Sequence, residues 1–207
     1  MNNILTDETN SFDELREYIL RYKHLISRTN SMIRAVNIIE KRFKNKLINI
    51  VETGCQRLFE HGGDGNSTSV FARIAKLMES HLYTVDINPQ NIQNCAEYTK
   101  NYSNFITYTV DDSINFLQKF DKPIHFLYLD SYDTGNGEKM RAACNHQLGE
   151  VVASLDKLTD DAIILSDDAA TLDTGKVAYS VPLLREKGFK ILWHSLELGQ
   201  VALSKTE

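Results

Sequence analysis

The sequence predicts a single α/β domain built on a mostly parallel sheet of seven strands, with helices on both faces. Short apolar runs rich in β-branched residues alternate with amphipathic helical stretches from residue 47 onward. The alternation then ends in two strand-like runs that lie only a few residues apart. The chain has 207 residues, which is enough to bury one sizeable core, and no proline- or glycine-rich linker divides it.

Residues 1–46 predict a helical cover that precedes the sheet. Ser11 and Glu14 have the spacing of a capping box, in which the two side chains satisfy free backbone amides at a helix start. Apolar residues then recur at helical spacing in two stretches. We expect this cover to lie on the larger unit formed by residues 47–207.

Strands and helices alternate through most of that larger unit. The strands are expected at residues 47–51, 81–85, 105–110, 124–129 and 162–165. The helices are expected at residues 69–79, 90–100, 113–120, 140–158 and 177–187. Each strand–helix–strand unit should be right-handed, so the strands run parallel and the helices cover both faces.

The C-terminal end departs from this alternation. Residues 190–194 and 200–203 both have the composition of strands. The segment between them is too short for a helical crossover, so the two strands should form an antiparallel hairpin. The last strand is therefore expected to be reversed.

Composition narrows the classes of function. The formal charge of −5 argues weakly against nucleic acid as the main partner, because phosphate binding needs clustered cations. The three cysteines have no CxxC spacing, which favours a reducing compartment without a disulfide framework. No apolar run is long enough to cross a membrane. We expect a cytoplasmic protein, and leave open whether it forms a homo-oligomer.

Candidate ligand-binding residues follow the first three strands, where open α/β sheets bind their ligands. After the first strand and in the loop that follows it come Glu52, Thr53, Gly54, Cys55 and Ser67. Asp86 ends the second strand, and Asp112 and Ser113 follow the third. Each feature also has a structural interpretation: the glycine turn as a plain strand–loop–helix connection, and the two acids as helix caps.

This set of motifs resembles the class I S-adenosylmethionine-dependent methyltransferases, over about residues 47–205. The resemblance implies a Rossmann-like sandwich and S-adenosyl-L-methionine as the cofactor. By likeness to the family, the turn at 52–55 and the loop to Ser67 hold the methionine part of the cofactor. Asp86 binds the ribose, and Asp112 with Ser113 binds the adenine.

A second acidic set follows the fourth and fifth strands, at Asp130, Asp167 and Asp168. Neighbouring strands lie less than ~5 Å apart, so these carboxylates should converge and repel unless a cation relieves them. The pattern resembles the metal-dependent O-methyltransferases of the catechol and macrocin types, which implies a Mg²⁺ ion held by all three residues. The alternatives are solvated turn caps, or a salt bridge from Arg141.

The resemblance implies transfer of a methyl group to a small hydroxylated molecule with help from the metal. Asp130 is expected to contact the cofactor and to act in catalysis, and His146 is a candidate general base. Two other classes remain. One is a non-catalytic S-adenosylmethionine-binding or scaffold protein with the same fold. The other is a nicotinamide-dependent enzyme, which the absence of a G-x-G-x-x-G motif disfavours.

Overall fold

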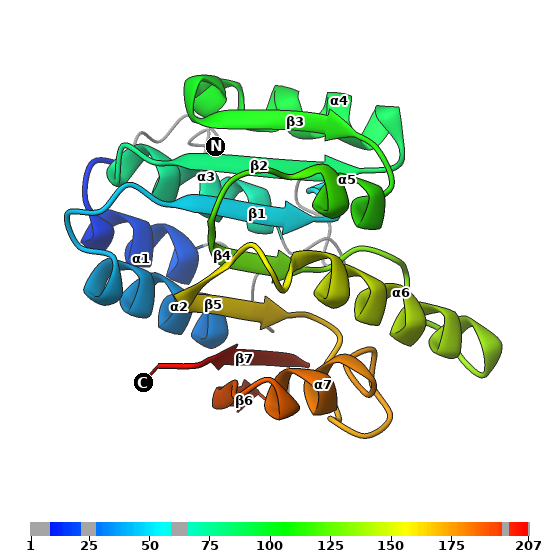
Figure 1. Cartoon of the computed structure of the whole chain (residues 1–207). Helices are drawn as coiled ribbons and strands as arrows, with labels where there is room; N and C mark the ends of the chain where they lie inside the picture. The colour runs from blue at the N-terminus through cyan, green and yellow to red at the C-terminus, as the bar shows by residue number, and fades with distance from the viewer. Residues whose placement is uncertain (1–8, 22–27, 59–65, 196–198, 207) are drawn as a thin grey trace.

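The structure is a computed structural model that describes residues 9–21, 28–58, 66–195 and 199–206. Its centre is a seven-stranded sheet with the strand order β3-β2-β1-β4-β5-β7-β6 (Figure 1). The strands are β1 (Asn49–Thr53), β2 (His81–Asp86), β3 (Ile106–Val110), β4 (Ile124–Leu129), β5 (Leu158–Ser166), β6 (Lys190–Ser195) and β7 (Gln200–Ser204). The predicted fold class is confirmed.

The reversed last strand is also confirmed. β7 lies between β5 and β6 and pairs antiparallel with both. The other neighbouring strands pair in parallel. All five residues of β7 are buried, so the C-terminal strand is an interior part of the sheet.

The helices cover both faces of the sheet (Figure 1). They are α1 (Phe12–Arg21), α2 (Thr29–Arg42), α3 (Ser67–Leu77), α4 (Pro89–Tyr98), α5 (Ser113–Lys119), α6 (Glu138–Ser154) and α7 (Ser180–Glu186), with a 3₁₀ helix at Lys100–Phe105. Successive residues of a strand are buried in two different apolar clusters, one on each face of the sheet. Ile50 packs with α1, α2 and α3, whereas its neighbour Val51 packs with α5, α6 and α7.

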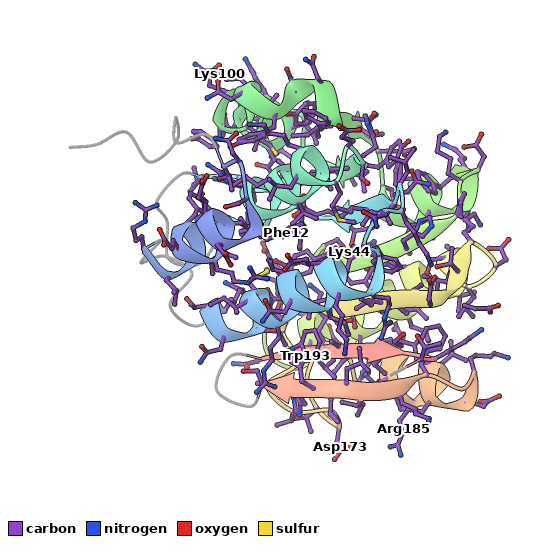
Figure 2. The ribbon with its side chains drawn as sticks, turned by 90° about the vertical axis from the view of Figure 1, so that its left-hand side faces the viewer. Phe12, Lys44, Lys100, Asp173, Arg185 and Trp193 are labelled. Carbon is purple, nitrogen blue, oxygen red and sulfur yellow. The ribbon has the colours of Figure 1, made fainter. Side chains whose placement is uncertain are left out.

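The N-terminal helices lie against the sheet, as Figure 2 shows. The buried apolar residues of α1 and α2 belong to the same cluster as those of β1 and β4, so these helices complete a common core. The Trp193 indole N–H on β6 donates to Ser31 Oγ on α2 at 3.0 Å. The predicted capping box is present in part: the Glu14 amide donates to Ser11 Oγ, whereas the Glu14 carboxylate accepts from the amide of Asn10, one residue before Ser11. None of the helices in the described ranges is long and apolar enough to span a bilayer.

The largest boundary difference concerns the fifth strand. β5 begins at Leu158, four residues earlier than the sequence pattern indicated, and α6 ends at Ser154. The cause is pairing: Leu158 is in register with Ile124 on β4, and the Ile124 amide donates to the Lys157 carbonyl at 2.8 Å. Leu158, which the sequence pattern assigned to the end of the helix, is therefore part of β5.

Candidate active site

A cavity of about 770 Å³ opens at the carboxyl ends of the parallel strands. It lies where β1 has β2 on one side and β4 on the other, which is the switch point of this sheet. Its wall includes these residues singled out from the sequence: Gly54, Cys55, Ser67, Asp86, Asp112, Ser113, Asp130, His146 and Asp168. The structure thus brings most of the predicted site residues together. Glu52, Thr53 and Asp167 are buried and are not part of the wall.

Gly54 is required by the protein backbone itself. Its φ is +80°, a conformation that favours glycine. A Cβ at this position would lie 2.5 Å from the Asp130 carbonyl oxygen. The Gly54 amide also donates to the Val85 carbonyl at 2.9 Å. The ends of β1, β2 and β4 can therefore approach one another closely only with glycine at this position. The sequence alone did not give this reason for the glycine.

Glu52 supports the site from behind. Its carboxylate is fully buried and accepts from three hydroxyl groups, those of Ser67 at 2.6 Å and of Thr68 and Thr84 at 2.7 Å each. Ser67 and Thr68 begin α3, so the carboxylate ties that helix start to β1 and β2. Because the carboxylate is buried behind the cavity wall, direct contact of Glu52 with the cofactor stays a prediction. The Thr53 side chain is also fully buried, and its contact with the cofactor stays a prediction as well.

Asp86 does not cap helix α4, which was the alternative role that the sequence left open. The cap of α4 is Asn88, whose side chain accepts from the Gln90 amide. Asp86 Oδ1 accepts from the Asn88 amide at 2.8 Å and from Asn91 Nδ2 at 3.0 Å. These two bonds fix the orientation of the carboxylate. Its other oxygen, Oδ2, has the Cys55 thiol at 3.8 Å.

Asp112 does cap its helix. Its Oδ1 accepts from the amides of Ile114 at 3.0 Å and Asn115 at 3.1 Å, at the start of α5. The residue still lines the cavity, so its other oxygen can serve a ligand. Ser113 lines the cavity as well, and its hydroxyl lies 2.8 Å from His146 Nε2.

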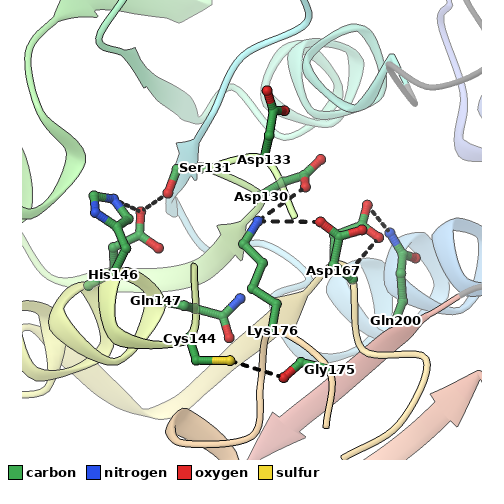
Figure 3. Close-up of polar contacts among 12 residues, drawn as sticks. Asp130, Ser131, Asp133, Cys144, His146, Gln147, Asp167, Gly175, Lys176 and Gln200 are labelled. Carbon is green, nitrogen blue, oxygen red and sulfur yellow. Dashed lines mark hydrogen bonds and ion pairs between the residues drawn. The ribbon is translucent and has the colours of Figure 1, made fainter. Parts of the chain in front are cut away.

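His146 projects from α6 into the cavity wall (Figure 3). Besides Ser113, its Nε2 has the buried Glu150 carboxylate at 3.7 Å. Ser131 Oγ donates to the same Glu150 oxygen at 2.5 Å. The Tyr132 ring lies over the imidazole with the two ring centroids 5.2 Å apart. The imidazole is therefore held in place on several sides while it faces the cavity.

The three acids after β4 and β5 do converge, as predicted (Figure 3). Asp167, however, is turned into the protein. Its Oδ2 accepts from Arg28 Nε at 2.5 Å, from the Tyr128 hydroxyl at 2.7 Å and from Gln200 Nε2 at 3.2 Å. Its Oδ1 accepts from the Asp168 amide at 2.8 Å. Both oxygens of this carboxylate are thus already bound.

A lysine that the sequence did not single out lies between the other two acids. Lys176 Nζ is 3.8 Å from Asp130 Oδ1 and 3.5 Å from Asp168 Oδ2. Within the described ranges, the cations that reach these acids are Arg28 and Lys176, where the sequence suggested Arg141.

The environment raises the pKa of two of these acids. Burial and the nearby Asp167 raise the pKa of the Asp130 carboxyl well above its usual range, although Lys176 and Arg28 oppose the shift. Burial likewise raises the pKa of Asp168. Repulsion among the carboxylates is therefore only partly relieved by the two cations.

This arrangement does not fit the expected Mg²⁺ site. Such an ion needs open carboxylate oxygens at about 2.1 Å, but Asp167 Oδ2 already accepts three hydrogen bonds and Lys176 lies between Asp130 and Asp168. Among the described residues, no group of three or more histidine, cysteine, aspartate or glutamate side chains is placed to hold a metal.

Comparison with known proteins agrees with the fold. Residues 59–169, more than half of the chain, match the family described as "Methyltransferase domain". The chain therefore belongs to that family, and the class I methyltransferase fold expected from its motifs is confirmed. No curated protein matches the sequence significantly.

Solved structures share the fold at low sequence identity. The S-adenosylhomocysteine-bound Podospora anserina methyltransferase PaMTH1 is 16% identical, with a TM-score of 0.62 over 100% of this chain and 89% of that one. A putative rRNA methylase from Clostridium thermocellum is 16% identical, with a TM-score of 0.59 over 83% and 94%. The O-methyltransferase NovP is 12% identical, with a TM-score of 0.58 over 88% and 81%.

Proposed function

We propose that this protein transfers a methyl group from S-adenosyl-L-methionine to a hydroxyl group of a small molecule. The observation that carries the proposal is the composition of the cavity wall. Asp86, Asp112 and Ser113 line it at the ends of β2 and β3, and Asp130 and His146 line it beside β4 and α6. The first group suits a nucleoside and the second suits a proton-bearing acceptor.

The cofactor supplies the electrophilic methyl group, so the protein has to bind, orient and shield the reactants. The oriented carboxylate of Asp86 suits two adjacent ribose hydroxyls. The backbone after Gly54 and the start of α3 at Ser67 suit the methionine carboxylate, because free amides at a helix start favour anions.

The acceptor hydroxyl must lose a proton as the methyl group is transferred. His146 and Asp130 are the two candidates to take it, because both face the cavity. Burial raises the pKa of the Asp130 carboxyl, which makes its carboxylate form a stronger proton acceptor. His146 is held by Ser113 and Tyr132, so its ring is already oriented before a ligand binds.

The size of the cavity supports a small acceptor. A volume of about 770 Å³ is typical of small-molecule sites, and the cofactor must occupy part of it. The net charge of −5 disfavours an RNA acceptor, although one of the similar structures is a putative rRNA methylase.

The proposal is tested by incubating the protein with methyl-labelled S-adenosylmethionine and a panel of phenols, catechols, sugars and RNA. An O-methylated small molecule, identified by mass spectrometry and lost in the Asp86→Ala variant, is the expected product. Methylated RNA, or a small molecule methylated on nitrogen or carbon, would contradict it. Tight cofactor binding without turnover on any acceptor would favour the scaffold alternative.

A further inference from the structure

Lys176 is a fully buried cation with no hydrogen-bond partner among the described residues. Burying an ammonium group is costly unless negative charge compensates it. The compensating charges are the carboxylates of Asp130 and Asp168, at 3.8 Å and 3.5 Å from its Nζ. Figure 3 shows the lysine side chain directed toward Asp130. The lysine and the two acids therefore form one electrostatic unit, in which both acids line the cavity.

The chain around Lys176 fixes it in this position. The Lys176 amide donates to the Asp168 carbonyl at 3.1 Å, and the Gly175 amide donates to the Thr171 carbonyl at 3.1 Å. A Cβ at Gly175 would lie 2.6 Å from that Thr171 oxygen, so the turn is tight. The Cys144 thiol on α6 donates to the Gly175 carbonyl at 3.4 Å. The turn thus returns the chain directly beneath the acids that follow β5.

Arg28 neutralises the remaining acid from the opposite direction. It comes from the start of α2, and its Nε donates to Asp167, whose side chain is 1% exposed. Together the two cations therefore reach one oxygen of each of the three carboxylates.

We propose that Lys176 and Arg28 supply the positive charge that a divalent ion would otherwise supply, so that this acidic cluster binds no Mg²⁺. A metal ion close to Asp130 and Asp168 would have to share their oxygens with an ammonium group that cannot escape to solvent. Lys176 is in this view a positioning residue that holds the two acids. If the proposed function is also correct, methyl transfer proceeds in excess chelator.

The test uses the full-length protein with Mg²⁺ or Mn²⁺ alone. The wild-type Tm should be the same in chelator and in millimolar Mg²⁺ at matched ionic strength, and the protein should leave the EPR signal of free Mn²⁺ unchanged. In Lys176→Gln the two acids lose their cation. Its Tm in chelator should fall by at least about 6 °C, the scale expected for a broken buried pair, and the variant should now bind Mn²⁺ and be stabilised by Mg²⁺.

The matched control is Lys46→Gln, which removes a lysine from an exposed pair with Asp161. It should neither lower the Tm appreciably nor create Mn²⁺ binding. Wild-type protein that binds Mn²⁺ and loses that binding in Asp168→Asn would overturn the proposal. So would a Lys176→Gln variant that gains no Mn²⁺ binding, whatever its Tm.

If the Lys176→Gln variant does not fold, the double variant Lys176→Gln/Asp168→Asn provides the test, because it removes one charge of each sign. Recovery of soluble, cooperatively melting protein in the double variant supports charge compensation. Failure to recover it contradicts the proposal, because the role of Lys176 would then not depend on the negative charge beside it. None of these readouts requires a known acceptor, so their failure is distinct from failure of the proposed function.

Discussion

Replacing Asp86 by alanine should weaken cofactor binding without unfolding the protein. Asp86 ends β2, lines the cavity, and has its carboxylate oriented by Asn88 and Asn91. A ribose hydroxyl that donates to this carboxylate makes a charge-assisted bond of ~1.5–3 kcal/mol. At about 1.4 kcal/mol per tenfold change, its loss corresponds to roughly a 10- to 150-fold rise in Kd.

Calorimetry with S-adenosylhomocysteine measures this change directly. The matched control is Asp111→Ala, since Asp111 follows the neighbouring strand β3 but pairs with Lys119 and does not line the cavity. The control should bind with wild-type affinity. Asp86→Asn, which keeps an oxygen for Asn88 and Asn91, separates loss of charge from local disorder. A folded Asp86→Ala protein with unchanged Kd would refute the assignment of Asp86 to the ribose.

Two further predictions concern what holds the site together. Glu52→Ala leaves three buried hydroxyls without their acceptor, at a cost of ~3 kcal/mol or more, so Tm should fall by about 6–12 °C; a thermal melt that matches wild type would show that these hydroxyls find other partners. Deleting residues 199–207 removes β7 from between β5 and β6, so the truncated protein should not melt cooperatively; a soluble, cooperatively folded truncation would contradict the interior placement of that strand.

The sequence predicted the fold well because the signals for it are local. Strand and helix periodicity, a capping box and a gap too short for a crossover each depend on a few neighbouring residues. The positions of Asp86 and Asp130 followed from the rule that ligands bind at the carboxyl ends of parallel strands. These inferences needed no knowledge of side-chain contacts.

The direction of the side chains was harder to predict. Both faces of β1 are buried, so its apolar run did not reveal that Glu52 points toward α3 and away from the cavity. The hydroxyls at Ser67 and Thr68 were the available signal, because a buried carboxylate needs donors. Local sequence also could not show Arg28 beside Asp167, since 139 residues separate the pair.

The contact of Lys176 with the acids also could not be predicted from the local sequence. It is eight residues from Asp168, in a turn with no strand or helix pattern. Nothing in that stretch indicates that the lysine turns back beneath the acids. Repelling carboxylates require a nearby positive charge, and either a metal ion or a cation of the chain itself can supply it.

The most direct test of the account is a crystal structure of the protein with S-adenosylhomocysteine. We expect density in the cavity at the switch point, with the ribose on Asp86, the adenine beside Asp112 and Ser113, and the amino-acid end between Gly54 and Ser67. The sulfur should then face Asp130 and His146. Density elsewhere, or a nucleoside in the reverse orientation with the ribose away from Asp86, would contradict it.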